Sequence, residues 1–139
     1  MLTELRWQKE LELMRSVFPQ FRPYARCSAG GMDTRVDPAS ACNLAEMGTT
    51  PAFGFEGRLI GPVSRRLYRV VLEAEPSTYP QCPPNVYLDP MVGHCWIGVS
   101  SKRTLCVTRT WRPAQSTFAN TLLVVVKYLD EHDGQPDAM

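Results

Sequence analysis

The first pattern in the chain is an apolar stripe close to its start. The members of the stripe are Trp7, Leu11, Met14 and Phe18. Their spacing of four, three and four residues places them on one face of a helix. Pro19 ends that helix, because proline cannot continue the hydrogen-bond pattern. We therefore predict a helix over residues 3–18 with the stripe facing a core.

Four segments in the middle of the chain have the character of strands. A short strand is predicted over residues 21–27, and three more over 52–60, 67–75 and 85–88, with the clearest polar and apolar alternation in 67–75. Gly- and Pro-rich turns between the last three favour hairpins. Most of residues 25–52 is rich in Ser, Gly, Asp, Pro and Ala, so it is expected to be loop.

The last third of the chain predicts an irregular segment followed by a helix. Residues 90–112 show no sustained periodicity. Ser116 is the expected N-cap of a helix over 116–132, and the tail over 135–139 is expected to fray. The inward side chains of this helix are expected to be Phe118, Leu122, Val125, Val126 and Leu129. Together the elements predict one α+β domain over residues 1–134, with helices packed on a four-stranded antiparallel meander.

Length, charge and cysteine usage narrow the class of protein. A chain of 139 residues allows one domain. A net charge of +1 without a dense Lys/Arg stripe gives no electrostatic reason to expect nucleic-acid or membrane partners. The longest apolar run, residues 122–126, is too short to cross a bilayer, and the charged start does not resemble a signal peptide. Five cysteines with neither CxxC pairs nor His at metal-ligand spacing predict a reduced, cytoplasmic protein without a metal site.

Three consecutive segments carry a family resemblance. They are GRLIGP at 57–62, LYRVVLEAEP at 67–76 and YPQCPPNVYL at 79–88. They resemble the ubiquitin-conjugating enzyme superfamily, in which a strand ending in Gly-Pro, an alternating strand and a Tyr-Pro-x-x-Pro-Pro-x-Val segment follow in this order. The likeness covers residues 1–132 and implies the fold of that family: N-terminal helix, four-stranded meander, active-site loop and C-terminal helix.

The resemblance continues into the family's active site. Family members carry a His-Pro-Asn element, a catalytic Cys in a Leu-Cys-Leu-like setting and a Trp-x-Pro segment before the next helix. The corresponding residues here are His94, Cys106 within TLCV, and Trp111 and Pro113 within WRP. Cys95 and Trp96 replace the family's Pro and Asn, and His94 lies twelve residues before Cys106. These departures, and a chain with one predicted C-terminal helix, look more like divergent bacterial members from antiphage defence operons, including cyclic-oligonucleotide-based (CBASS) systems.

Cys106 is the residue to which the resemblance assigns catalysis. A thiolate is a strong nucleophile, and a thioester keeps its acyl group activated toward amines. The resemblance therefore implies an acyl-carrier transferase that takes the C-terminus of a ubiquitin-like protein or of a cGAS-like nucleotidyltransferase, a cyclic-nucleotide synthase. Its partner would be an adenylating activating enzyme that spends the ATP, so the protein itself needs no cofactor. The alternative is that Cys106 is a buried structural thiol.

The residues around Cys106 have two interpretations each. His94 either organises the loop through backbone hydrogen bonds or acts as a general base. Trp96 either donates a hydrogen bond in place of the missing Asn or packs, and Cys95 is a competing nucleophile. Four cations could favour the thiolate or contact an acidic partner, or they could form a solvated loop. They are Lys102, Arg103, Arg109 and Arg112.

Two structural roles complete the expected site. Trp111 and Pro113 are expected to buttress the active-site segment against the final helix. The first helix has a polar face opposite its apolar stripe, made of Arg6, Lys9, Glu10 and Glu12. In this family that face docks the activating enzyme, which makes Arg6 and Lys9 candidate partner contacts; a charged helix face is also commonly just solvated.

Other functions stay open on this sequence. A noncatalytic, RWD-like binding module would share the opening helix and the Tyr-Pro-Pro segment without needing Cys106. A stoichiometric trap would hold a partner's C-terminus on Cys106 without turnover. A Cys-His hydrolase is a weaker alternative, because no Asn or Asp that would orient His94 can be identified.

Overall fold

The computed structural model describes residues 2–29, 32–46, 50–92, 96–99, 102–105 and 111–134. Its helices are α1 (Glu4–Val17), the 3₁₀ helix η1 (Pro38–Glu46) and α2 (Phe118–His132). Its strands are β1 (Arg22–Ala29), β2 (Met32–Val36), β3 (Thr50–Ile60), β4 (Leu67–Ala74), β5 (Asn85–Asp89), β6 (Trp96–Val99) and β7 (Lys102–Leu105). The described part of the chain is therefore α+β, and none of its helices is long and apolar enough to cross a membrane.

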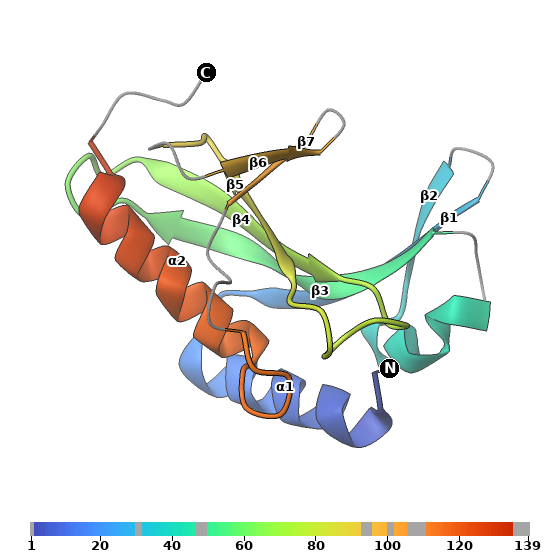
Figure 1. Ribbon diagram of the computed structural model, residues 1–139. Coiled ribbons are helices and arrows are strands. Elements are labelled where there is room, and N and C mark those ends of the chain that lie inside the picture. Colours follow the sequence, from blue (N-terminus) through green and yellow to red (C-terminus); the bar gives the residue numbers. More distant parts are fainter. Residues whose placement is uncertain are drawn as a thin grey trace.

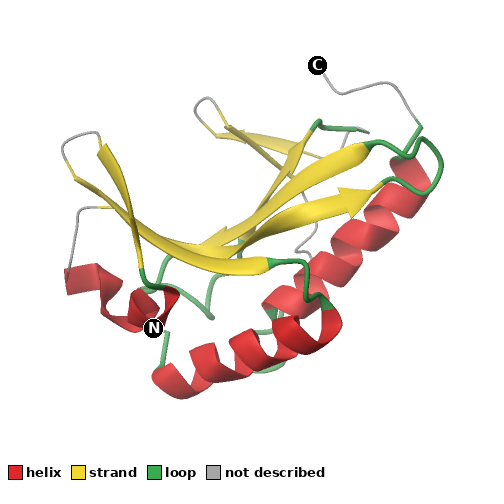
Figure 2. Cartoon of the chain, turned by 180° about the vertical axis from the view of Figure 1, so that it is seen from behind, coloured by secondary structure: helices red, strands yellow, loops and turns green. Residues whose placement is uncertain are grey.

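The strands form one large antiparallel sheet and one hairpin. In the described residues the sheet has the order β2–β1–β3–β4–β5, and β6 pairs with β7. Figure 1 shows α1 and α2 side by side on one face of the sheet. The view from behind in Figure 2 shows that the sheet curves away from these helices. In the described part of the chain, the helices thus lie on one face of the sheet and the other, concave face carries no helix.

An aromatic cluster joins both helices to the sheet. The Trp7 ring of α1 lies 5.0 Å from the Phe53 ring and 5.5 Å from the Phe55 ring of β3, measured between centroids. Phe118, the first residue of α2, lies 5.6 Å from Phe53 and stacks on Tyr79 at 5.0 Å. All five rings are buried. Such pairs add to the free energy gained by burying their apolar area, so this cluster fixes where the two helices sit.

The helices agree closely with the sequence pattern. Trp7, Met14 and Phe18 are buried and Leu11 is partly buried, as predicted for the first helix. In α2 the predicted inward residues are buried except Val126, which is partly buried. The expected N-cap was one residue early: the cap is Thr117, whose hydroxyl accepts from the Asn120 amide while the Asn120 side chain accepts from the Thr117 amide. This reciprocal pair is a capping box.

The sheet has one strand more than predicted. The four predicted strands are present as β1, β3, β4 and β5, adjacent in that order. The fifth, β2, pairs with the outer side of β1 in a stretch expected to be loop, and η1 follows it. Its residues are mostly exposed, so they carry no apolar alternation. The β6–β7 hairpin was also missed, because its region shows no sustained periodicity.

A buried aspartate ties the end of α2 to the turn between β3 and β4. Asp133 accepts hydrogen bonds from the Val63 and Ser64 amides, both at 2.8 Å, from the Ser64 hydroxyl at 2.6 Å and from the Tyr68 hydroxyl at 2.7 Å. A side chain at Gly61 would overlap this carboxylate. Burial acts to raise the pKa of Asp133, but the hydrogen bonds from Ser64, Tyr68 and Val63 outweigh it and hold the pKa well below its usual range.

Candidate functional site

The residues expected to carry catalysis lie mostly outside the described residues. These are His94, Cys95, Cys106 and Arg109. Trp96 lies in β6, and Lys102 and Arg103 lie in β7. The register of the hairpin pairs Trp96 with Leu105 and Val99 with Lys102. The chain therefore enters β6 and leaves β7 at the same end of the hairpin.

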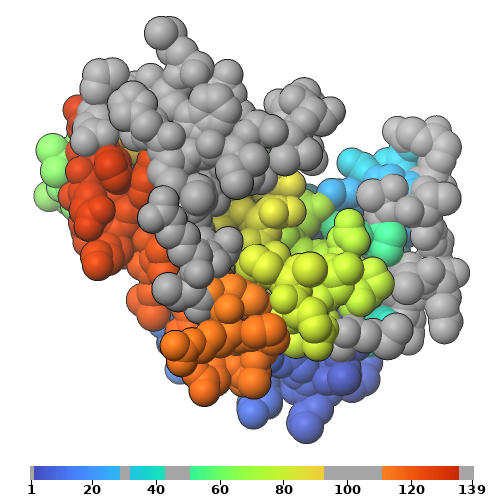
Figure 3. Space-filling view, viewed as in Figure 1, coloured from blue at the N-terminus to red at the C-terminus, as the bar shows by residue number. Residues whose placement is uncertain are grey.

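Trp111 connects two of the motifs that define the expected site. Its indole Nε1–H donates to the Pro80 carbonyl oxygen at 2.7 Å, and its ring lies 5.7 Å from the Tyr79 ring. The Trp-Arg-Pro segment thus packs directly on the Tyr-Pro turn, 31 residues earlier in the chain. Pro113 is held as well, because its carbonyl oxygen accepts from Arg6 Nη1 at 2.8 Å. Figure 3 shows residues 111–117, in orange, beside the yellow-green Tyr79 segment and above α1.

Beneath this contact lies a buried charged network. Glu10 is 1% exposed. Its carboxylate accepts from Arg6 Nε at 3.1 Å, from the Phe118 amide at 3.0 Å and from the Tyr79 hydroxyl. Arg6 also donates to the carbonyl oxygens of Pro113 and Ser116. The network therefore joins α1, the Tyr79 turn and the start of α2.

The network corrects the expected polar face of the first helix. Glu10 lies in the interior, not on a solvated face, and the partly exposed Arg6 guanidinium donates to Glu10 and to the Pro113 carbonyl oxygen. Helical spacing indicates the position of Glu10. It stands three residues after Trp7 and four before Met14, so it lies on the same face of the helix as the apolar stripe. Its charge predicted a position at the surface, because burying an isolated carboxylate costs free energy. The three donors compensate that cost.

Burial shapes the protonation of this network. It raises the pKa of Glu10, while hydrogen bonds from Tyr79, Phe118 and Arg6 act in the opposite direction. Burial and the neighbouring Glu10 carboxylate also raise the pKa of the Tyr79 hydroxyl, which stays protonated and donates. Because the partners are fixed inside the protein, the network positions backbone segments and offers no free acid or base to a ligand.

A groove on the helical side is open to a partner. It has a volume of about 450 Å³ and runs between α1 and the residues before α2. Residues of α1 and of the segment before α2 line it: Arg6, Lys9, Glu10, Glu12, Leu13, Ala114, Gln115 and Thr117. Lys9 and Glu12 are exposed. Of the two candidate contacts on α1, Lys9 thus faces solvent beside a groove, whereas Arg6 is bound in the network.

Other chemistry on the described chain is limited. Cys27 and Cys42 are partly buried, and Cys82 is exposed, all as free thiols. Burial and Glu4 raise the pKa of Cys42, which disfavours a reactive thiolate there. Within the described ranges, no cluster of three or more His, Cys, Asp or Glu could hold a metal ion.

Near the candidate site, the Tyr128 hydroxyl of α2 donates to the Val92 carbonyl oxygen at 2.5 Å and fixes the chain after β5.

Comparisons with protein-family models, with curated proteins and with solved structures found no match for this chain.

Proposed function

We propose that this protein is a conjugating enzyme of ubiquitin-conjugating type that carries an acyl group as a thioester on Cys106. Cys106 Sγ bonds to the C-terminal carbonyl carbon of a ubiquitin-like protein or of a cyclic-nucleotide synthase, and the bond from that carbon to the activating enzyme's leaving group breaks. An amine then attacks the thioester, and the Cys106 thiol leaves as the amide forms. ATP is spent by the activating enzyme in the cytoplasm of a bacterium that defends itself against phage.

The observation that carries the proposal is the contact between two distant motifs. The Tyr-Pro turn and the Trp-x-Pro segment belong to one site in the proposed class, and here Trp111 donates to Pro80 at 2.7 Å. The order of α1, the β1–β3–β4–β5 strands and α2 is also that of the proposed ubiquitin-conjugating fold. This arrangement supports a site formed where residues 106–110 lead into Trp111.

The β6–β7 register supports the same assignment. Trp96 pairs with Leu105, His94 precedes Trp96 by two residues, and Cys106 directly follows Leu105 in the sequence. A short chain distance limits how far residues can separate. In the proposed site His94 organises the segment beside Cys106, Trp96 supplies an indole donor or packs, and Lys102 and Arg103 favour the thiolate or contact the incoming acidic partner.

The test is the formation of a covalent adduct. Wild type, Cys106→Ala and Cys106→Ser are each incubated with ATP in a lysate of the source cells and examined by intact mass and non-reducing gels. We expect a thiol-sensitive adduct on wild type, none on the Ala variant, and a thiol-resistant ester on the Ser variant. Cys82→Ser is the matched control, because Cys82 is an exposed thiol in the described residues and should leave the adduct unchanged.

The same assay separates the competing functions. A noncatalytic binding module would retain the same partners in all variants and form no adduct. A stoichiometric trap would form the adduct but would not release it when an excess of a primary amine is added. The conjugating enzyme should lose the adduct to that amine within the time course.

A further inference from the structure

The open face of the sheet carries an uneven distribution of charge. Because side chains alternate along strands, five arginines and four carboxylates share this face. Arg26 forms ion pairs with Asp33 and with Glu73 at one end of it. The other charged residues are Arg22 of β1, Arg35 of β2, Arg58 of β3 and Arg69 of β4, with Glu56 of β3 and Asp89 of β5. In the described residues no helix covers this face (Figures 1 and 2). The local excess is positive, although the whole chain is nearly neutral.

Glu56 is shared and cannot neutralise all of these arginines. Its carboxylate accepts from Arg35 Nη1 at 3.2 Å and Nη2 at 3.3 Å. Arg69 Nη2 lies 3.6 Å from its second oxygen. Glu56 also stands opposite Arg22 in the β1–β3 register, but no ion pair joins those two residues. The carboxylate is therefore committed to Arg35 and Arg69.

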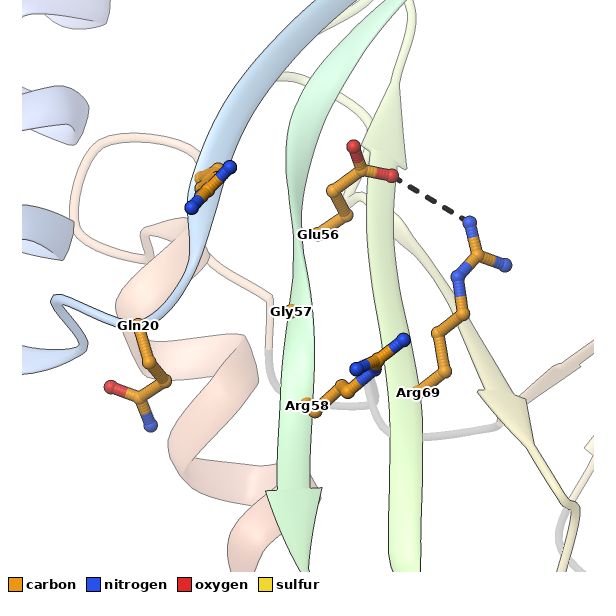
Figure 4. A pocket seen from close by; sticks show the side chains of 6 residues that line it. Gln20, Glu56, Gly57, Arg58 and Arg69 are labelled. Atoms are coloured by element: carbon orange, nitrogen blue, oxygen red, sulfur yellow. Dashed lines mark ion pairs between the residues drawn. The ribbon is translucent and has the colours of Figure 1, made fainter.

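Arg58 is left in an unfavourable position. The β3–β4 register places it directly opposite Arg69, and like charges in such cross-strand positions repel. Neither Arg58 nor Arg22 forms an ion pair or a side-chain hydrogen bond within the described part of the chain. Figure 4 shows Arg58 extending toward the strand of Arg69, while the dashed line joins Arg69 to Glu56. The two unpaired guanidiniums are available to an anion.

These side chains line a hollow of about 460 Å³. Gln20, Arg22, Glu56, Arg58 and Arg69 form its walls, and Gly57 adds backbone. Guanidiniums bind carboxylates and phosphates through two parallel N–H groups. An anion placed here would pair with Arg22 and Arg58 and would relieve the repulsion between Arg58 and Arg69.

An apolar patch continues from the arginines on the same face. Ile60 and Leu67 are opposite each other in the next outward-facing row after Arg58 and Arg69, and they are 63% and 51% exposed. Val63, in the turn beyond them, is 69% exposed. Aliphatic side chains beside guanidiniums match a ligand that offers a carboxylate next to an apolar group. A nucleic-acid backbone fits less well, because its line of phosphates would meet Glu56 and Asp89.

We propose that this surface binds an acidic segment of a partner polypeptide. Carboxylates of the segment pair with Arg22 and Arg58, and an adjacent apolar side chain of the segment covers Ile60 and Leu67. The surface lies on the opposite side of the sheet from the α1 groove. The inference does not rest on the proposed thioester chemistry, since Cys106 and the motifs around it in the sequence contribute no residue to this surface.

The test uses fluorescence anisotropy with a labelled peptide of alternating Glu and Leu residues. We expect the full-length wild type to bind it, and the double variant Arg22→Gln/Arg58→Gln to bind at least about tenfold more weakly, as loss of charge-assisted hydrogen bonds predicts. Leu67→Ser should weaken binding severalfold by removing apolar contact. Lys127→Gln, an exposed cation on α2, is the matched control and should bind like wild type.

Thermal unfolding of the same variants separates binding from folding. Arg58→Gln should have a Tm equal to or above that of wild type, because it removes the repulsion with Arg69. Cys106→Ala should bind the peptide normally, which keeps this inference distinct from the proposed catalysis. The proposal is overturned if wild type fails to bind the Glu/Leu peptide or binds an alternating Gln/Leu peptide equally well. It is also overturned if single-stranded RNA or phosphatidylserine vesicles bind more tightly through the same two arginines.

Discussion

At the scale of single residues, Glu10 organises three segments that are distant in sequence. One carboxylate oxygen accepts from the amide at the start of α2, and the other accepts from Arg6 and Tyr79. A negative charge at a helix N-terminus is also favoured by the helix dipole. The buried position is tolerable only because every polar partner is satisfied, and removing one member leaves the others unpaired.

Removal of the Glu10 side chain should therefore destabilise the folded protein. Glu10→Ala is expected to lower the free energy of unfolding by about 3 kcal/mol, because the Arg6 charge and the Tyr79 and Phe118 donors lose their acceptor. Urea unfolding followed by circular dichroism measures the change. Glu12→Ala, on the exposed side of the same helix, should change the free energy by no more than about 0.5 kcal/mol. Similar effects of the two substitutions would contradict the network.

At the scale of elements, α2 is fixed at both of its ends. Thr117 and Asn120 cap its start, where Glu10 adds a further acceptor. Asp133 holds its end against the turn that joins β3 to β4. The segment leading into the helix is anchored in turn, because Trp111 donates to Pro80. A helix fixed in this way gives the preceding residues a defined point of attachment.

The capping assignment can be tested directly. Thr117→Ala should destabilise the protein by about 1 kcal/mol, because the Asn120 amide loses its acceptor. Thr117→Ser retains the hydroxyl and should recover most of that loss. Equilibrium urea unfolding of both variants provides the measurement. If the Ala and Ser variants proved equally unstable, the hydroxyl would not be the cap.

At the scale of the whole molecule, two buried carboxylates give stability opposite dependences on pH. The pKa of Asp133 is lowered by folding, so its contribution is present above its unfolded pKa of about 3.9 and is lost as the pH falls toward the folded value. The pKa of Glu10 is raised, so the pH-dependent part of its contribution is present below about pH 4.3 and is lost as the pH rises through the folded value, while the hydrogen bonds to its carboxylate persist. Acid therefore weakens the attachment of α2 at its end and not at its start.

This difference predicts how an Asp133 variant behaves. At pH 7, Asp133→Asn should lower Tm by several degrees, because the neutral amide is a weaker acceptor for its donors. The gap in Tm between wild type and variant should narrow as the pH falls below about 4, because the unfolded wild-type chain then binds a proton that the folded Asp133, with its lowered pKa, does not bind. Thermal unfolding from pH 7 to pH 2 measures the gap. Asp130→Asn, exposed on α2, is the control, and a gap for Asp133→Asn that did not change with pH would contradict the prediction.

Local patterns of periodicity, together with helix-ending and turn residues, predicted the two helices and four of the strands. The spacing of Trp7, Leu11, Met14 and Phe18 identified the buried face of α1. The alternation over β4 likewise identified its buried side chains, Tyr68, Val70, Leu72 and Ala74. The buried side of a helix or strand takes apolar residues at the repeat of that element, about 3.6 residues in a helix and two in a strand. Which side is buried can therefore be read from neighbouring residues in the sequence. The order of the motifs also suggested the class of chemistry, which stays a prediction until the adduct is sought.

Only the tertiary structure decided where the charged residues lie. Strand β2 is exposed and held by its neighbour, so it has no apolar period to detect. Glu10 was expected at the surface because its compensating donors, Tyr79 and Phe118, are about 70 and 108 residues away. The arginines of the open face are scattered in sequence and meet only across paired strands. The electrostatic environment of a charged side chain depends on its distances in space to other charges, and the linear order of residues does not give those distances.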